Sequence, residues 1–201
     1  MTTKKTILLE NVTLSFANIY VAKGFNGNAP KFSANFLISK DDVNAINLIK
    51  DTTQELLQKE FGANQPKIKD THLVLKDGDS QTWGGYANNF YVAATNGEKY
   101  PPQIVDIFGE DLRSVANAVN SGDKVNAILD IWVQNNQYGK RVNATLKGVQ
   151  LVQSNTQKAT NNGTGFNFKS KEEPTETPKL AFGKKAEEPK EIDDDISKIF
   201  D

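Results

Sequence analysis

Aromatic and basic side chains occur together at three places in this chain of 201 residues. In the segment DKVNAILDIWVQ, the apolar alternation of Val125–Val133 leaves Trp132 on the opposite, polar face of an expected strand. The next turn adds Tyr138 and two basic residues, and a glycine-rich segment places Phe25 between two lysines. An aromatic ring can stack on an unpaired base while a nearby cation contacts phosphate. The candidate nucleic-acid-binding residues are therefore Lys23, Phe25, Lys31, Tyr91, Trp132, Tyr138, Lys140 and Arg141.

A structural role is an alternative for these rings. If a loop or a helix covers Trp132, the indole serves packing rather than binding. In GGYANNFYVAA, Tyr86 and Phe90 fall on one face of an expected strand and Tyr91 on the other. At least one of these two groups is therefore expected in the core.

Residue types suited to catalysis or metal binding are scarce. His72 is the single histidine, and the chain contains no cysteine, which excludes a thiolate metal site. The sequence has no P-loop, no GxGxxG and no nucleophile-elbow motif. KDGDS begins like a calcium loop but lacks the later ligands, including the closing Glu. We therefore expect a protein that is not an enzyme and that uses no metal or cofactor.

Alternating polar and apolar residues predict several β-strands. Residues 6–16 place Val12, Leu14 and Phe16 on one buried face. Residues 31–39 alternate in the same way, and a loop with glycine and proline separates the two segments. The alternation in DKVNAILDIWVQ continues as RVNATLKGVQLV after the turn NNQYGK, which predicts a hairpin.

One segment has a helical period. Apolar residues recur every three or four positions over 41–61, Glu55 and Lys59 form an i,i+4 pair, and Gly62 ends the helix. Short extended segments near LVL, GGYANNFYVAA and PPQIVD bring the number of strands to between five and seven. The pattern predicts a mainly β fold, a small closed or partly open barrel with one inserted α-helix.

The composition changes after residue 153. Residues 154–201 are rich in Asn, Gly, Thr, Pro, Lys and Glu, and their sparse apolar residues show no period. Such a segment cannot bury enough surface to offset its conformational entropy. We therefore predict a domain over residues 1–153 and a disordered tail over residues 154–201.

The tail ends in EIDDDISKIFD, which gathers acids around apolar side chains. Terminal blocks of like charge are often interaction segments, although acids can also serve solubility alone. The candidate partner-binding residues are Asp193, Asp194, Asp195, Ile196, Ile199 and Phe200. At the other end, MTTKKTILLENVTLSF interrupts its apolar runs after at most three residues, which predicts neither a signal peptide nor a membrane span. We expect a cytoplasmic protein.

These segments together resemble the bacteriophage single-stranded DNA-binding proteins of the OB-fold type. The resemblance covers most of residues 6–153 and rests on NVTLSFANIY, PKFSANFLIS, LKDGD, GGYANNFYVAATN, PPQIVD and the hairpin from SGDKV through Trp132 to NNQYGK. The acidic end is similar to that of bacterial and phage single-strand binders. It departs from their pattern in that Lys198 interrupts the acids and Asp201, rather than Phe, is last.

The resemblance implies an OB-fold-like barrel that binds and protects single-stranded DNA without catalysis during phage replication, recombination or repair. It also implies that the acidic tail recruits replication or recombination proteins, with the acids meeting basic rims and Phe200 entering an apolar pocket. A phage-encoded protein of this kind acts in the host cytoplasm.

Two other functions remain open from the sequence. A protein-interaction adaptor would use the barrel and the acidic tail without binding nucleic acid, and a strand-annealing recombination protein would share the DNA-binding surface. The sequence does not choose between DNA and RNA, because that choice depends on contacts to the sugar. It does not fix the oligomeric state either.

Overall fold

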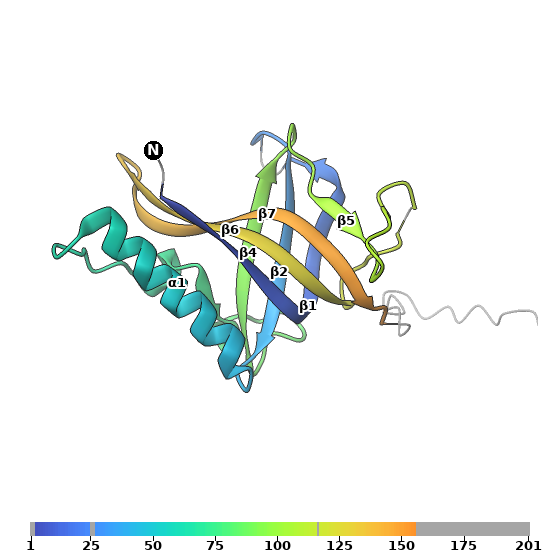
Figure 1. Cartoon of the computed structure of the whole chain (residues 1–201), viewed down its shortest axis with the longest axis horizontal. Helices are drawn as coiled ribbons and strands as arrows, with labels where there is room; N and C mark the ends of the chain where they lie inside the picture. The colour runs from blue at the N-terminus through green and yellow to red at the C-terminus, as the bar shows by residue number, and fades with distance from the viewer. Residues whose placement is uncertain (1–2, 25–26, 116, 156–201) are drawn as a thin grey trace, which may run out of the picture. The chain divides into compact units, whose positions relative to one another are not determined.

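The computed structural model describes residues 3–24, 27–115 and 117–155. The described chain forms seven strands, one α-helix and two 3-10 turns (Figure 1). In chain order these are β1 (Lys4–Lys23), β2 (Lys31–Ser39), α1 (Val43–Phe61), η1 (Asp70–His72), β3 (Leu75–Asp77), η2 (Gly78–Ser80), β4 (Asn89–Gly97), β5 (Gln103–Val105), β6 (Lys124–Asn136) and β7 (Gly139–Gln153).

Five strands close into a barrel in the order β1-β2-β4-β7-β6. The long strand β1 pairs antiparallel with β6 through its first half and with β2 through its second half. A short parallel pairing of β4 with β7, at Ala94–Ala144 and Thr95–Thr145, completes the ring. β3 pairs with β4 and β5 with β7 outside the ring. The predicted barrel of five to seven strands with one inserted helix is confirmed.

The barrel interior is filled by the inward-pointing half of each strand. In β6 the alternating residues Val125 to Val133 are all buried, as predicted, and β7 contributes Val142, Ala144 and Leu146. Phe36 of β2 and Val92 of β4 meet them in the same apolar cluster. Because side chains alternate across a strand, the intervening residues of these strands lie on the outer surface.

The helix forms where its period predicted it. The Asp42 side chain caps it by accepting a hydrogen bond from Ala45 N at 3.0 Å, and Gly62 ends it with φ of 57°. Ile46, Ile49, Leu56 and Leu57 join the core cluster, so α1 packs beside the barrel (Figure 1). Hydrogen bonds from Lys5 and Lys59 lower the pKa of Glu55 to about 2. None of the described helices is long and apolar enough to cross a membrane.

Phe16 departs from the prediction for the first strand. Val12 and Leu14 are buried as expected, but Phe16 lies on the outside with 52% of its surface exposed. The register of β1 against β2 shifts between Ser15 and Asn18, where three steps along β1 match two along β2. This bulge interrupts the alternation, and Phe16 has φ of 46° within it. The prediction of an inward Phe16 is wrong for that reason.

The segment after β3 requires a glycine. A Cβ on Gly78 would overlap the backbone oxygens of Tyr86 and Asn89, whereas a Cβ on Gly84 would meet no atom within 4 Å. Gly78→Ala is therefore expected to lower the free energy of unfolding by about 1–3 kcal/mol, as overpacking does, and Gly84→Ala to change it little. Urea unfolding of both variants checks this, and equal stability of the two would contradict it.

Candidate nucleic-acid interface

Trp132 lies on the outer face of β6, opposite the buried row from Val125 to Val133. Its side chain is half-buried, and its Nε1–H donates a hydrogen bond to Oγ1 of Thr145 on β7 at 3.0 Å. This bond fixes the orientation of the indole on the sheet. The predicted placement of Trp132 on the polar face is confirmed.

A shallow groove surrounds this indole. We call it the Trp132 groove, and it draws on four of the five barrel strands and on the segment after β4. Its lining residues are Lys4, Asn96, Tyr100, Asp130, Trp132, Thr145 and Lys147. The groove thus combines two aromatic rings, two ammonium groups and hydrogen-bonding side chains, which are the groups that bind a single strand.

Asp130 is the one carboxylate in the groove. It is almost fully buried, and it accepts hydrogen bonds from Nζ of Lys4 at 3.0 Å and from the hydroxyl of Thr6. Burial opposes its ionisation, but the hydrogen bonds from Thr6 and Lys4 outweigh burial, so the pKa of Asp130 lies below its usual value. Lys4 balances this charge, and Lys147 leaves the groove with a net positive charge.

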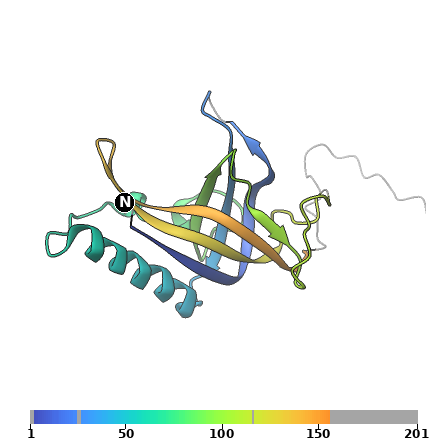
Figure 2. The ribbon, with the colours of Figure 1, turned by 45° about the horizontal axis from the view of Figure 1, so that its top comes forward.

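The hairpin between β6 and β7 extends past the groove, beside the N-terminal end of β1 (Figure 2). Arg141 pairs with Gln134, two residues from the pair Trp132–Asn143, so Arg141 lies on the same face as Trp132. Lys140 lies on the other face, where its Nζ is 5.1 Å from the centre of the Phe61 ring at the end of α1. Tyr138 is exposed at the tip of the hairpin.

The two lysines of the first hairpin, Lys23 and Lys31, pair with each other and are both exposed. Lys31 also pairs with Gly97, whose carbonyl accepts a hydrogen bond from Tyr100 N. Lys31 therefore lies at the end of β4 from which the groove residue Tyr100 follows. Phe25 lies outside the described residues.

Tyr91 points outward from β4, but other rings cover it. Only 6% of its surface is exposed, and its ring centre is 5.2 Å from that of Tyr86 and 6.5 Å from that of Trp83. Burial raises the pKa of its hydroxyl. With so little free surface, Tyr91 is placed to support other rings rather than to stack on a base itself.

The structure brings together more groove residues than the sequence indicated. Among the lining residues, Trp132 was predicted as a binding residue, whereas Lys4, Asn96, Tyr100 and Lys147 were not. The predicted Arg141 lies on the same face but outside the groove lining. The alternation in β7 could have identified Lys147, because it continues the outward series Asn143 and Thr145. Lys4 reaches Trp132 because the two residues pair directly across β1 and β6. Asn96 and Tyr100, at and after the end of β4, reach Trp132 only through barrel closure.

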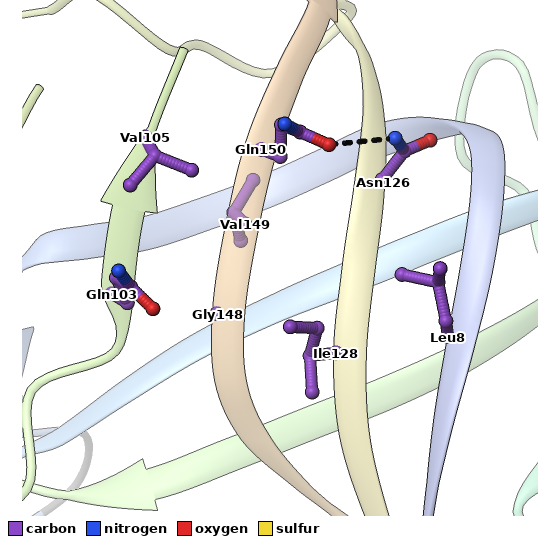
Figure 3. A pocket seen from close by; sticks show the side chains of 8 residues that line it. All are labelled: Leu8, Gln103, Val105, Asn126, Ile128, Gly148, Val149 and Gln150. Atoms are coloured by element: carbon purple, nitrogen blue, oxygen red, sulfur yellow. Dashed lines mark hydrogen bonds between the residues drawn. The ribbon is translucent and has the colours of Figure 1, made fainter. Parts of the chain in front are cut away.

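A second hollow lies over β1, β5, β6 and β7 (Figure 3). Leu8, Ile128 and Val105 give it an apolar floor, and the Nδ2 of Asn126 donates a hydrogen bond to Oε1 of Gln150 at 2.9 Å along its edge. Its lining side chains are apolar or neutral amides, so it does not offer the cations that phosphates require. Across the described residues, no group of three His, Cys, Asp or Glu side chains could hold a metal ion.

Comparison with known proteins connects this geometry to a family. Residues 5–177 match the family model described as the ssDNA-binding protein of Enterobacter phage Enc34. A putative protein, p50, of Acyrthosiphon pisum secondary endosymbiont phage 1 is 34% identical over 153 residues, which are 72% of this chain and 82% of that protein.

Solved structures give the same family and the same fold. The single-stranded DNA-binding protein of bacteriophage Enc34, in complex with ssDNA, is similar with a TM-score of 0.64 and 28% identity, over 74% of this chain and 86% of that one. The single-stranded DNA-binding protein gp2.5 of bacteriophage T7 has a TM-score of 0.55 at 15% identity, over 78% of this chain and 96% of that one, which is a likeness of fold.

The Asp130 contacts give a test of the groove's electrostatics. Because the pKa of Asp130 is lowered from 3.8, its ionised form stabilises the fold above that pH, and the contribution is lost as the pH falls below it. Asp130→Asn is therefore expected to lower the free energy of unfolding at pH 7 by about 1 kcal/mol, a modest value because Lys4 is largely solvent-exposed. The difference from the wild type should shrink at pH 3.

Urea unfolding at the two pH values measures this difference. Asp51→Asn, at an exposed position on α1, is the matched control and should change little at either pH. A deficit of Asp130→Asn that is the same at pH 7 and pH 3 would show that the charge of Asp130 is not the cause.

Proposed function

This chain belongs to the family of single-stranded DNA-binding proteins represented by that of Enterobacter phage Enc34, and from this we propose that it binds single-stranded DNA, without catalysis, on the outer surface of its barrel. The observation that carries the proposal is the Trp132 groove, where an aromatic ring on a rigid strand stands between lysines of two neighbouring strands.

The chemistry of the groove favours unpaired bases. The indole face of Trp132 offers a stacking surface, and Lys4 and Lys147 line the same groove, where their ammonium groups can contact phosphates next to a stacked base. Stacking contributes roughly 1–3 kcal/mol per base, and it requires a base that is not already stacked in a duplex. Single strands are therefore preferred over duplex DNA.

The outer surface of the barrel also supplies a path from the groove. A row of short polar side chains crosses all five barrel strands through successive backbone pairs, and we call it the polar row: Asp130, Thr145, Thr95, Ser33 and Asn18. In an OB-fold, the second and third strands form the usual oligonucleotide face, and here these strands are β2 and β4. The polar row joins this face to the Trp132 groove.

The electrostatics favour moderate dependence on salt. The whole chain has a formal charge of −1, with 24 basic and 25 acidic residues, so phosphate contacts are few compared with those of a basic duplex binder. Each neutralised phosphate adds about one unit to the salt slope, so we expect a slope of only a few units.

The biological role follows as a further part of the proposal. The protein protects single strands during phage replication, recombination or repair in the host cytoplasm. Residues 1–153 bind the DNA, and residues 154–201 recruit replication or recombination proteins. In that segment the contacts would come from the acidic and apolar side chains of Asp193, Asp194, Asp195, Ile196, Ile199 and Phe200, which lie outside the described residues.

Trp132 provides the most direct variant. Trp132→Ala is expected to weaken binding to a fluorescent dT oligonucleotide by about 5- to 100-fold, because it removes one stacking contribution. Trp132→Phe keeps an aromatic ring and should retain most of the affinity. Fluorescence anisotropy measures both, with circular dichroism to verify the fold. An unchanged dissociation constant for a folded Trp132→Ala protein would exclude stacking at this residue.

The hairpin offers a matched pair of cations. Arg141 faces the same side as Trp132, whereas Lys140 contacts Phe61 on the opposite side. Arg141→Ala is expected to weaken binding and to lower the salt slope by about one unit, and Lys140→Ala to leave the slope unchanged. Titrations of both variants at several salt concentrations measure these salt slopes. Equal slopes for the two variants would show that the DNA does not contact the hairpin face that carries Arg141.

A further inference from the structure

A second aromatic site lies on the outer face of β1, β2 and β4. We call it the Phe16–Trp83 patch: Phe16 and Trp83 form its exposed layer, and Leu37, Tyr86 and Tyr91 form the layer beneath. We propose that this patch is a second base-stacking subsite for single-stranded DNA. The inference rests on the proposed function and adds a site to it.

Phe16 reaches this surface through the bulge in β1. With φ of 46°, it has a conformation that a bulky side chain rarely adopts, and a regular strand would have turned its ring toward the core. Bulges commonly redirect a side chain next to a binding site, and strained backbone tends to occur at functional sites. The fold thus carries strain to hold a large apolar ring in water, with 52% of the residue exposed.

The exposed rings have a rigid support. The centres of the Phe16 and Trp83 rings are 5.1 Å apart with an angle of 76° between the planes, and Trp83 makes the same contact with Tyr86. Tyr86 is fully buried, and its hydroxyl accepts a hydrogen bond from Nδ2 of Asn35 at 2.7 Å. Trp83 keeps 44% of its surface exposed, so the patch presents aromatic surface that is already fixed in place.

The loop that carries Trp83 is also held. Lys40 forms ion pairs with Asp77 and Asp79 on both sides of Gly78, and hydrogen bonds to Lys40 lower the pKa of both carboxyls. Asp79 in turn accepts a hydrogen bond from Asn88 N at 2.6 Å, which fixes the far end of the loop. An ordered platform loses little conformational entropy when a base stacks on it.

The patch lies on a continuous path from the Trp132 groove. Tyr91 and Leu37 are paired neighbours on β4 and β2, the two strands of the usual OB-fold oligonucleotide face. Thr95 of the polar row is four residues from Tyr91 on β4, and β7 alone separates β4 from β6. Trp132 pairs with Asn143, which lies two residues before Thr145 and is therefore level with Ala93, two residues from Tyr91 on β4. Strand spacing then places Tyr91 and Trp132 roughly 10 Å apart across the strands and about 7 Å along them. A strand of a few nucleotides can cover this separation, within the site size of one OB-fold.

A cation also stands beside the patch. Nζ of Lys76, on β3, is 5.9 Å from the centre of the Tyr91 ring. β3 pairs with the edge of β4, so this lysine lies next to the patch on the side away from β2. A phosphate adjoining a stacked base can meet this charge, which gives the patch the same two components as the Trp132 groove.

Three variants test the subsite in the full-length protein with fluorescent dT oligonucleotides. Phe16→Gly removes the ring and suits the positive φ, so its melting temperature should be equal to or higher than that of the wild type. Trp83→Ala removes the other exposed ring. Each is expected to weaken binding by about 5- to 100-fold. Phe108→Ala, at a residue that is 88% exposed in the segment after β5, is the matched control and should bind like the wild type.

Fluorescence adds a readout specific to the patch. In the Trp132→Phe variant, Trp83 is the single remaining tryptophan, and dT binding is expected to quench it. If Phe16→Gly and Trp83→Ala bind like the wild type while Trp132→Ala is weakened, the second subsite is refuted and the proposed function stands. If the wild-type protein does not bind dT, the proposed function fails and the subsite fails with it.

Discussion

Closure of the barrel depends on the short parallel contact between β4 and β7. Ala94 lies opposite Ala144 there, and these small side chains point into the interior between larger ones such as Val92 and Leu146. Closure divides the side chains of the five ring strands into an inner set, which packs, and an outer set, which meets solvent. It also brings the end of β4, with Asn96 and Tyr100, next to Trp132 on β6. The Trp132 groove, the proposed binding surface, is therefore a consequence of the same contact that completes the core.

The two aromatic sites use this outer set in different ways. Trp132 follows the regular alternation of β6, and its hydrogen bond to Thr145 orients the ring without any departure from strand geometry. Phe16 reaches the surface only because β1 departs from that geometry at its bulge. One site thus follows from ordinary strand periodicity, and the other depends on local strain that the surrounding sheet supports.

Much of the fold could be predicted from the sequence because its periods are clear. The alternation in β6 placed Trp132 correctly, and the apolar period and Gly62 located the helix. Phe16 was mispredicted because a bulge changes the phase of a strand without a clear signal in the residue types. The opposite faces of Lys140 and Arg141 follow from the alternation of β7. The contact of Lys140 with Phe61 and the cover over Tyr91 depend on how α1 and the loop with Trp83 pack, which local sequence patterns do not contain.

The most direct measurement of the central claim is a titration of the wild-type protein with a fluorescent dT oligonucleotide and with a duplex of equal length, each at two salt concentrations. The stacking surfaces and the small number of cations predict tight binding to the single strand, weak binding to the duplex and a salt slope of only a few units. Equal affinity for the two DNAs, or no binding to the single strand, would contradict the account.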